Sequence, residues 1–79
     1  MSNLPTDAEV ERAILNEIKK RKVRAGEIFP VPQVSADLQQ EGFSGEEIAA
    51  AFERMVEKKW LEPSHGPMGK LLEEGFKVM

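Results

Sequence analysis

One short turn organises this chain, and it reads Glu41-Gly42-Phe43-Ser44-Gly45-Glu46-Glu47-Ile48. Gly42 suits the left-handed conformation that ends a helix. Ser44 and Glu47 have the spacing of a capping box, in which each side chain accepts a backbone N–H at the start of the next helix. Phe43 and Ile48 occupy the two positions of a hydrophobic staple. The turn therefore predicts two helices joined tightly, at an angle fixed by packing.

The helices on either side of this turn each show one apolar face. The helix that follows should run from about Gly45 to Lys59. Its apolar positions fall on one side of a helical wheel: Ile48, Ala51, Phe52, Met55 and Val56. The helix that precedes the turn has Pro32 in its first turn, where a missing N–H costs nothing, and ends at Gly42. Its apolar residues are Val31, Val34 and Leu38.

A further helix is expected nearer the N-terminus. Thr6 and Glu9 form a second capping box, and apolar residues follow at helical spacing. These residues are Val10, Ile14, Leu15 and Ile18. This helix should run to about Arg24 and stop near Gly26, a residue suited to the left-handed conformation.

Three short segments read as strands. Residues 27–29 are β-prone and are closed by Pro30, and residues 60–62 are ended by Pro63. Residues 64–69 have the composition of a turn, after which residues 70–72 can return as the other strand of a hairpin. Residues 73–79 can form one or two helical turns, which Gly75 weakens.

The length and composition of the chain exclude several classes of protein. We expect a single domain over residues 1–79, with residues 1–5 as a disordered tail. The chain has no Cys and one His, which excludes a disulfide framework, a thiolate metal site and a multi-histidine cage. No catalytic motif is present, so we expect neither an enzyme nor a cofactor. No apolar run approaches the ~18 residues of a membrane span, and no signal peptide is evident, so we expect a cytoplasmic protein.

The order of these elements resembles a winged helix-turn-helix domain, an α+β and mostly helical fold with three helices and a small two- or three-stranded wing. The turn at residues 41–44 and the segment 59–62 that leads into the hairpin carry most of the resemblance. Residues 70–76 resemble the wing exit of bacterial regulators of the MarR and PadR families. Leu72 stands where those families have a Thr, so the cap of the last helix is missing. The resemblance implies a DNA-binding regulator whose third helix enters the major groove.

The outward face of the third helix bears on that implication. It is expected to present Glu46, Ala50, Glu53, Arg54 and Glu57. DNA binding normally depends on Lys and Arg that neutralise phosphates. A carboxylate about 7 Å from a phosphate costs roughly 0.6 kcal/mol even in bulk water. This face therefore suits either a solvated helix surface or a basic partner better than it suits DNA.

Positive charge gathers elsewhere, in a basic block near the end of the first helix. The block consists of Lys19, Lys20, Arg21, Lys22 and Arg24. It can serve as an anion-binding patch, or it can complement the dipole of the helix that it ends. The wing offers three further candidate contact residues, namely His65, Met68 and Lys70. Lys70 can contact a phosphate or remain solvated, and Met68 can contact a partner or fold back on Trp60.

Three hypotheses follow from the sequence. The first is a small stand-alone DNA-binding transcriptional regulator, acting as a homodimer because DNA sites are usually read twofold. The second is a protein–protein interaction module that uses its acidic third helix to bind a partner with a basic surface. The third is a subunit or accessory domain with a structural role.

Overall fold

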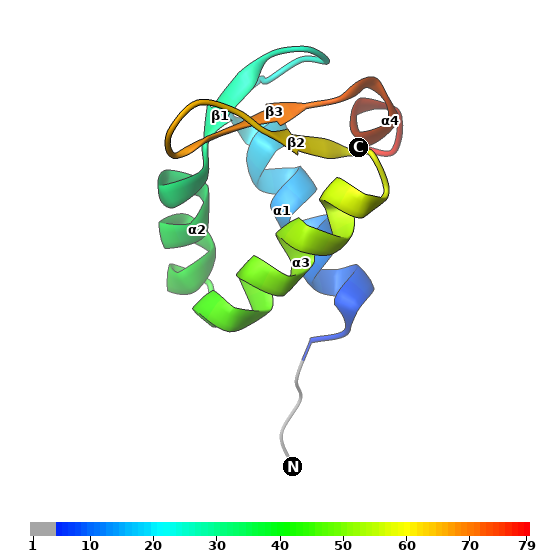
Figure 1. Cartoon of the computed structure of the whole chain (residues 1–79). Helices are drawn as coiled ribbons and strands as arrows, with labels where there is room; N and C mark the ends of the chain where they lie inside the picture. Colours follow the sequence, from blue (N-terminus) through cyan, green and yellow to red (C-terminus); the bar gives the residue numbers. More distant parts are fainter. Residues whose placement is uncertain (1–4) are drawn as a thin grey trace.

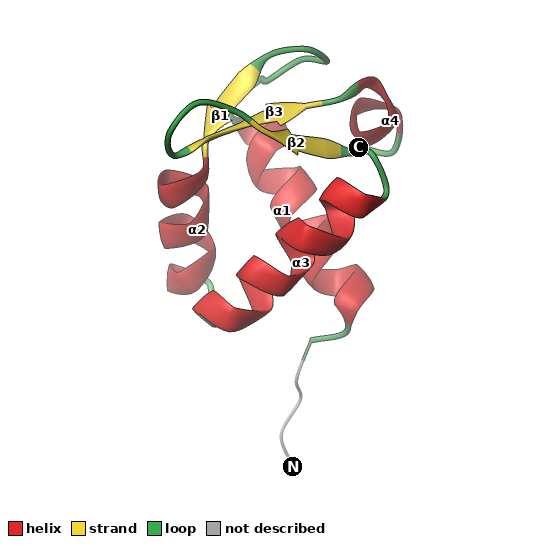
Figure 2. Ribbon diagram, viewed as in Figure 1, coloured by secondary structure: helices red, strands yellow, loops and turns green. Residues whose placement is uncertain are grey.

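The computed structural model describes residues 5–79, and this part of the chain contains four helices and three strands (Figures 1 and 2). The bounds are α1 Asp7–Lys20, β1 Ile28–Pro30, α2 Val31–Gln40, α3 Gly45–Glu57, β2 Leu61–Pro63, β3 Met68–Leu71 and α4 Glu73–Lys77. The fold is thus α+β and mostly helical, as the sequence predicts. Of the expected N-terminal tail, residues 1–4 lie outside the described residues.

Both predicted capping boxes are present. The N–H of Glu9 donates to the Thr6 hydroxyl over 3.1 Å, and the N–H of Thr6 donates to the Glu9 carboxylate over 2.9 Å. Ser44 and Glu47 repeat this exchange at 3.1 and 2.9 Å at the start of α3. These bonds satisfy backbone donors that a helix start otherwise leaves exposed, and they explain why local sequence fixes both starting points.

The end of α1 differs from the prediction. The N–H of Val23 donates to the carbonyl of Ile18, which is the long bond of a Schellman motif. The residue that adopts the left-handed conformation there is Lys22, at a φ of 59°. The expectation that this helix reaches Arg24 and stops near Gly26 is therefore wrong, because the chain already turns at Lys22. Gly26 does adopt the expected left-handed conformation, at a φ of 88°, but in the loop that follows the helix.

The other two long helices close in the same way. Gly42 is left-handed at a φ of 107°, as predicted, and the N–H of Phe43 donates to the carbonyl of Leu38. At the end of α3, Lys59 is left-handed at a φ of 66°, so α3 ends slightly before the predicted position. The turn between α2 and α3 therefore has the conformation that the sequence predicts.

The strands form one antiparallel sheet in the order β1-β3-β2. Ile28 and Glu62 both lie opposite Lys70, on either side of the central strand. Met68 and Gly69 belong to β3, not to the turn in which the sequence placed them. Their pairing with β1 extends the strand, and Gly69 packs so closely that a Cβ there would lie 2.8 Å from the Phe29 ring.

The sheet lies across one end of the three long helices, and the N-terminal side of α1 lies at the opposite end (Figure 1). The core between them consists of Val10, Ile14, Leu15, Ile18, Phe29, Val34, Leu38, Ile48, Ala51, Met55, Leu61 and Leu71. The short helix α4 begins at Glu73, and its N-cap residue Leu72 supplies no side-chain hydrogen bond, as the sequence predicts. Gly75 lets α4 approach the backbone of Trp60, where a Cβ would collide with the carbonyl group.

Candidate functional site

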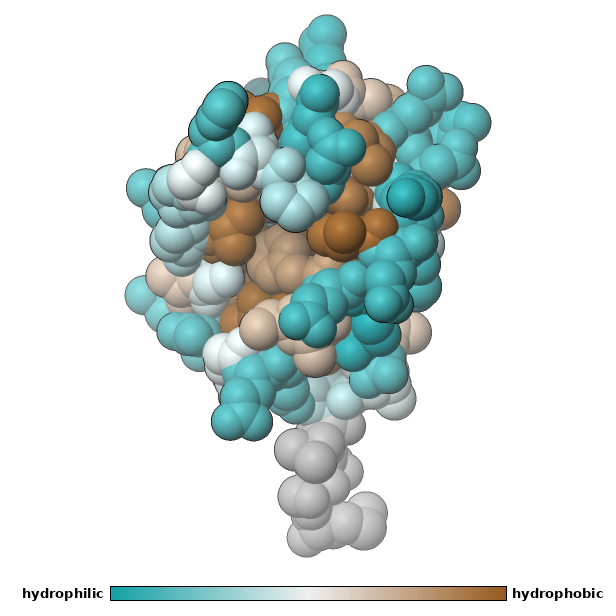
Figure 3. Space-filling view, viewed as in Figure 1, coloured by the Kyte–Doolittle hydropathy of each residue, from teal (hydrophilic) through white to brown (hydrophobic). Residues whose placement is uncertain are grey.

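A groove of about 430 Å³ opens between α2, α3 and the β2–β3 hairpin. We call it the α2–α3 groove. Figure 3 shows the apolar surface gathered in a hollow on this face, with hydrophilic side chains around it. The helices contribute Val31, Pro32, Ser35, Ile48, Ala49, Phe52 and Val56, and the hairpin contributes Leu61, Pro63, Pro67 and Met68. A concave surface of this composition suits an apolar side chain of a ligand or partner.

Two aromatic rings of the groove lining hold its walls together. The rings of Phe29 and Phe52 are stacked, with centroids 6.4 Å apart and planes 19° apart. Phe29 is fully buried in β1, whereas Phe52 is half-buried on α3 and packs against the core. The stack connects the sheet to α3 beneath the groove.

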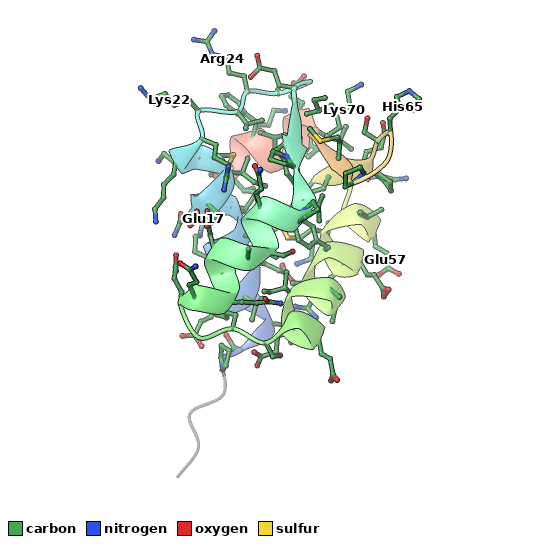
Figure 4. The ribbon with its side chains drawn as sticks, turned by 90° about the vertical axis from the view of Figure 1, so that its left-hand side faces the viewer. Glu17, Lys22, Arg24, Glu57, His65 and Lys70 are labelled. Atoms are coloured by element: carbon green, nitrogen blue, oxygen red, sulfur yellow. The ribbon has the colours of Figure 1, made fainter. Side chains whose placement is uncertain are left out.

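Carboxylates line the exposed face of α3 beside the groove. Glu46, Ala50, Glu53 and Glu57 are all exposed, as the sequence predicts. Figure 4 shows Glu57 pointing away from the body of the molecule. None of the three carboxylates forms an ion pair with any residue in the described part of the chain. We call Glu46, Glu53 and Glu57 the acidic rim.

Arg54 lies apart from the other residues predicted on this face. Its Nε donates to the Glu11 carboxylate over 2.7 Å, and its Nη1 lies 3.6 Å from the Asp7 carboxylate. Lys58 also donates to Glu11, over 2.5 Å. Arg54 therefore joins α3 to α1, and the rim keeps its negative charge without a guanidinium beside it.

Glu11 was not a candidate from the sequence, yet it is the most tightly held acid described. Its side chain is only 5% exposed. Burial raises the pKa of Glu11, but the hydrogen bonds and positive charges of Arg54 and Lys58 outweigh it and hold that pKa below its ordinary value of 4.5. The cluster joins α1 to α3, and both carboxylate oxygens of Glu11 are bound within it.

Two members of the basic block have partners within the protein. Arg21 donates to Asp37 over 2.6 Å, and Lys20 lies 3.4 Å from Glu17 and 3.9 Å from Glu41. Lys19, Lys22 and Arg24 form no ion pair within residues 5–79. Figure 4 shows Lys22 and Arg24 on the opposite side of the molecule from Glu57. The structure therefore does not bring the basic block together with the α3 face.

The hairpin residues occupy three different environments. His65 is exposed in the turn, and Met68 is half-buried and lines the α2–α3 groove. Lys70 lies on β3 between Ile28 and Glu62 in the register of the sheet. Of the three, Met68 belongs to the groove. Lys58 rather than the hairpin covers Trp60, with its Nζ 4.6 Å from the ring centroid, a cation–π distance.

Sequence reasoning found the acidic rim but missed the groove beside it. The groove joins residues from three elements that are far apart in the chain, and no local pattern signals such a meeting. Across residues 5–79, no three His, Cys, Asp or Glu side chains gather in a way that could hold a metal ion. The helices in this range include none long and apolar enough to cross a membrane. Comparison with protein families, curated proteins and solved structures gives no match for this chain.

Proposed function

We propose that this chain is a protein-interaction module. Its α2–α3 groove takes a bulky apolar side chain from a basic segment of a partner protein, and the acidic rim holds the cations of that segment. The observation that carries the proposal is the juxtaposition of an apolar hollow with unpaired carboxylates along one helix. An apolar anchor gives affinity, whereas complementary charge gives association rate and selectivity.

The position of the rim carboxylates supports a role outside folding. Glu46 lies in the first turn of α3, where the helix dipole favours negative charge. Glu57 is the last residue of the helix, where the dipole opposes negative charge, and Glu53 lies before the last turn, beyond the reach of either helix end. Since neither has an ion-pair partner among the described residues, they contribute no evident stability. A cationic partner gives both carboxylates a favourable interaction.

DNA binding is the alternative. The order of elements and the β1-β3-β2 sheet support the proposal that the fold is a winged helix-turn-helix domain, with the β2–β3 hairpin as its wing. In that fold α3 would meet the phosphates with its acidic rim, while Lys22 and Arg24 lie on another side of the molecule. This electrostatic mismatch favours a protein partner over nucleic acid. We also propose that the protein is cytoplasmic, the location that the sequence predicts.

A peptide titration followed by amide NMR shifts tests the function. The probe is a synthetic helical peptide of Lys and Ala with one central Leu. We expect it to shift amides around Ile48, Phe52 and Met68 and to bind more weakly as salt is added. Replacing the Leu by Ala should remove the groove shifts, and replacing the Lys residues by Glu should abolish binding. No binding of the Lys–Leu peptide at about 1 mM, where affinity is worth only about 4 kcal/mol, would contradict the proposal.

Two double charge reversals distinguish the effect of the acidic rim on peptide binding from the effect of net charge. Glu53→Lys with Glu57→Lys should weaken peptide binding at least tenfold. Glu73→Lys with Glu74→Lys changes the net charge equally but acts on α4, away from the groove, and should leave binding within twofold. Thermal melts check that both double variants are folded. Titration with a short DNA duplex at low salt forms the other arm, and shifts of the α3 amides by DNA alone would favour the alternative.

A further inference from the structure

Ile28 is the most exposed large apolar side chain in the described part of the protein, at 52%. It lies in β1, directly opposite Lys70 in the register of the sheet. The loop that leads into β1 carries Lys22 and Arg24, both exposed. We call Lys22, Arg24 and Ile28 the basic knob. It combines an apolar anchor with neighbouring cations, which are the features that the α2–α3 groove and its acidic rim would select.

The loop that bears the knob is held in place by backbone hydrogen bonds. The N–H of Gly26 donates to the carbonyl of Leu71 over 2.7 Å, and the N–H of Leu71 donates to the carbonyl of Glu27 over 2.9 Å. The Glu27 carboxylate also accepts the N–H of Arg24, over 2.8 Å. Because the loop is already ordered against β3, little conformational entropy would be lost when another molecule binds it.

The charges of the knob and of the rim are complementary and lie apart. Neither Lys22 nor Arg24 forms an ion pair within residues 5–79, and the same is true of the rim carboxylates. Figure 4 shows the two cations at the upper left of the molecule and Glu57 at the right, and neither the cations nor Ile28 line the groove of their own chain. A second molecule can bring the two surfaces together.

We propose that the occupant of the α2–α3 groove is a second copy of this chain. Ile28 of one molecule enters the groove of the next, and Lys22 and Arg24 approach the acidic rim there. This inference rests on the proposed function, because it names the partner of that same groove. It is independent of the twofold homodimer that a DNA-binding regulator would form.

Knob and groove are different surfaces, so the contact is heterologous. Each added molecule presents a new knob and a new groove, and assembly continues head to tail instead of stopping at a twofold dimer. A single loop in one groove makes a small interface, and interfaces under roughly 1,200 Å² belong to the weak, transient class. Self-association should therefore appear at high concentration and decrease with salt, because charge drives part of it.

Sedimentation velocity tests the inference over about 10 µM to 1 mM. We expect the average mass of the wild-type chain to rise with concentration at low salt, and to fall back to the monomer at about 0.5 M salt. The knob variant carries Arg24→Ala and Ile28→Ala, and the groove variant carries Glu53→Lys and Glu57→Lys. Each variant alone should remain a monomer.

Mixing the two variants gives the sharpest result. The knob variant keeps an intact groove and the groove variant keeps an intact knob, so their equimolar mixture should form a one-to-one complex that grows no further. Phe76→Glu serves as a control, because Phe76 is also exposed, at 46%, but lies on α4. This control should self-associate as the wild type does.

Several outcomes would overturn the inference. A wild-type chain that stays monomeric up to 1 mM would do so, and groove shifts by the Lys–Leu peptide would then still support the proposed function. Self-association that survives in both variants, or that Phe76→Glu abolishes, would assign the contact to another surface. Failure of the variant mixture to form a complex, while the wild type self-associates, would exclude knob-in-groove docking.

Discussion

The two sides of α3 differ in whether their charged side chains form ion pairs within the protein. On the side that faces α1, Arg54 and Lys58 converge on the buried carboxylate of Glu11. On the exposed side, Glu53 and Glu57 have no ion-pair partner among residues 5–79. Arg54 belongs to the thirteen-residue helix and Lys58 is its C-cap residue, so cations face α1 whereas carboxylates face outward.

This contrast separates charges that maintain the fold from charges that are available to a partner. A buried carboxylate requires compensation, and two cations supply it at hydrogen-bond distance. An exposed carboxylate requires none, because water solvates it. Glu53 and Glu57 therefore can be retained for binding, since the fold gains nothing evident from them. If the division holds, replacements on the α1 side of α3 should affect stability and replacements on its exposed side should affect binding.

Glu11→Ala should have the largest effect on stability. It removes two charge-assisted hydrogen bonds and leaves a gap between α1 and α3. Arg54 and Lys58 are partly exposed and can recover some hydration, so we expect a loss of about 2 kcal/mol in the free energy of unfolding. Urea denaturation measures it. Glu53→Ala is the matched control on the other side of α3 and should stay within about 0.5 kcal/mol. Equal losses for the two variants would refute the contrast.

Lowering the pH should remove the contribution of the Glu11 carboxylate to the free energy of unfolding. The pKa of Glu11 is lower in the folded protein than its ordinary value of 4.5, so the folded state favours the charged form. The resulting stability is fully present above pH 4.5 and is lost as pH falls through the lowered pKa. The difference in unfolding free energy between wild type and Glu11→Gln should therefore narrow below pH 4.5. A difference that widens in acid would show that the charged form is not the favoured one.

Local chemistry explains how much of the fold could be predicted. Thr6 with Glu9, and Ser44 with Glu47, are only three residues apart, so both helix starts follow from the sequence alone. Gly42 likewise marks its turn, because glycine adopts the left-handed conformation without strain. Lys22 gives no such signal. A left-handed Lys costs roughly 1–2 kcal/mol. The hydrogen bond from Val23 to Ile18 and the packing of Val23 against the core stabilise it there.

The site was only half predictable for a similar reason. The exposed carboxylates follow from the helical wheel, since the apolar face of α3 defines what lies opposite it. The same wheel placed Arg54 outward, because it contains no information about α1. Glu11 and Arg54 are 43 residues apart, and only the packing of the two helices brings them together. The groove depends on three elements meeting, so no segment of the sequence could reveal it.

Glu57→Lys should have the smallest effect on stability, and the sign of that effect shows whether Glu57 serves the fold or binding. Glu57 is the last residue of α3, where the helix dipole favours a cation. Glu57→Lys should therefore raise the free energy of unfolding slightly, by about 0.3 kcal/mol, while it weakens binding of the Lys–Leu peptide several-fold. Paired urea curves and peptide titrations on the same preparation measure both quantities. A residue whose replacement stabilises the fold and impairs binding is retained for binding. If Glu57→Lys instead lowers stability and leaves binding unchanged, Glu57 belongs with Glu11 among the charges that maintain the fold.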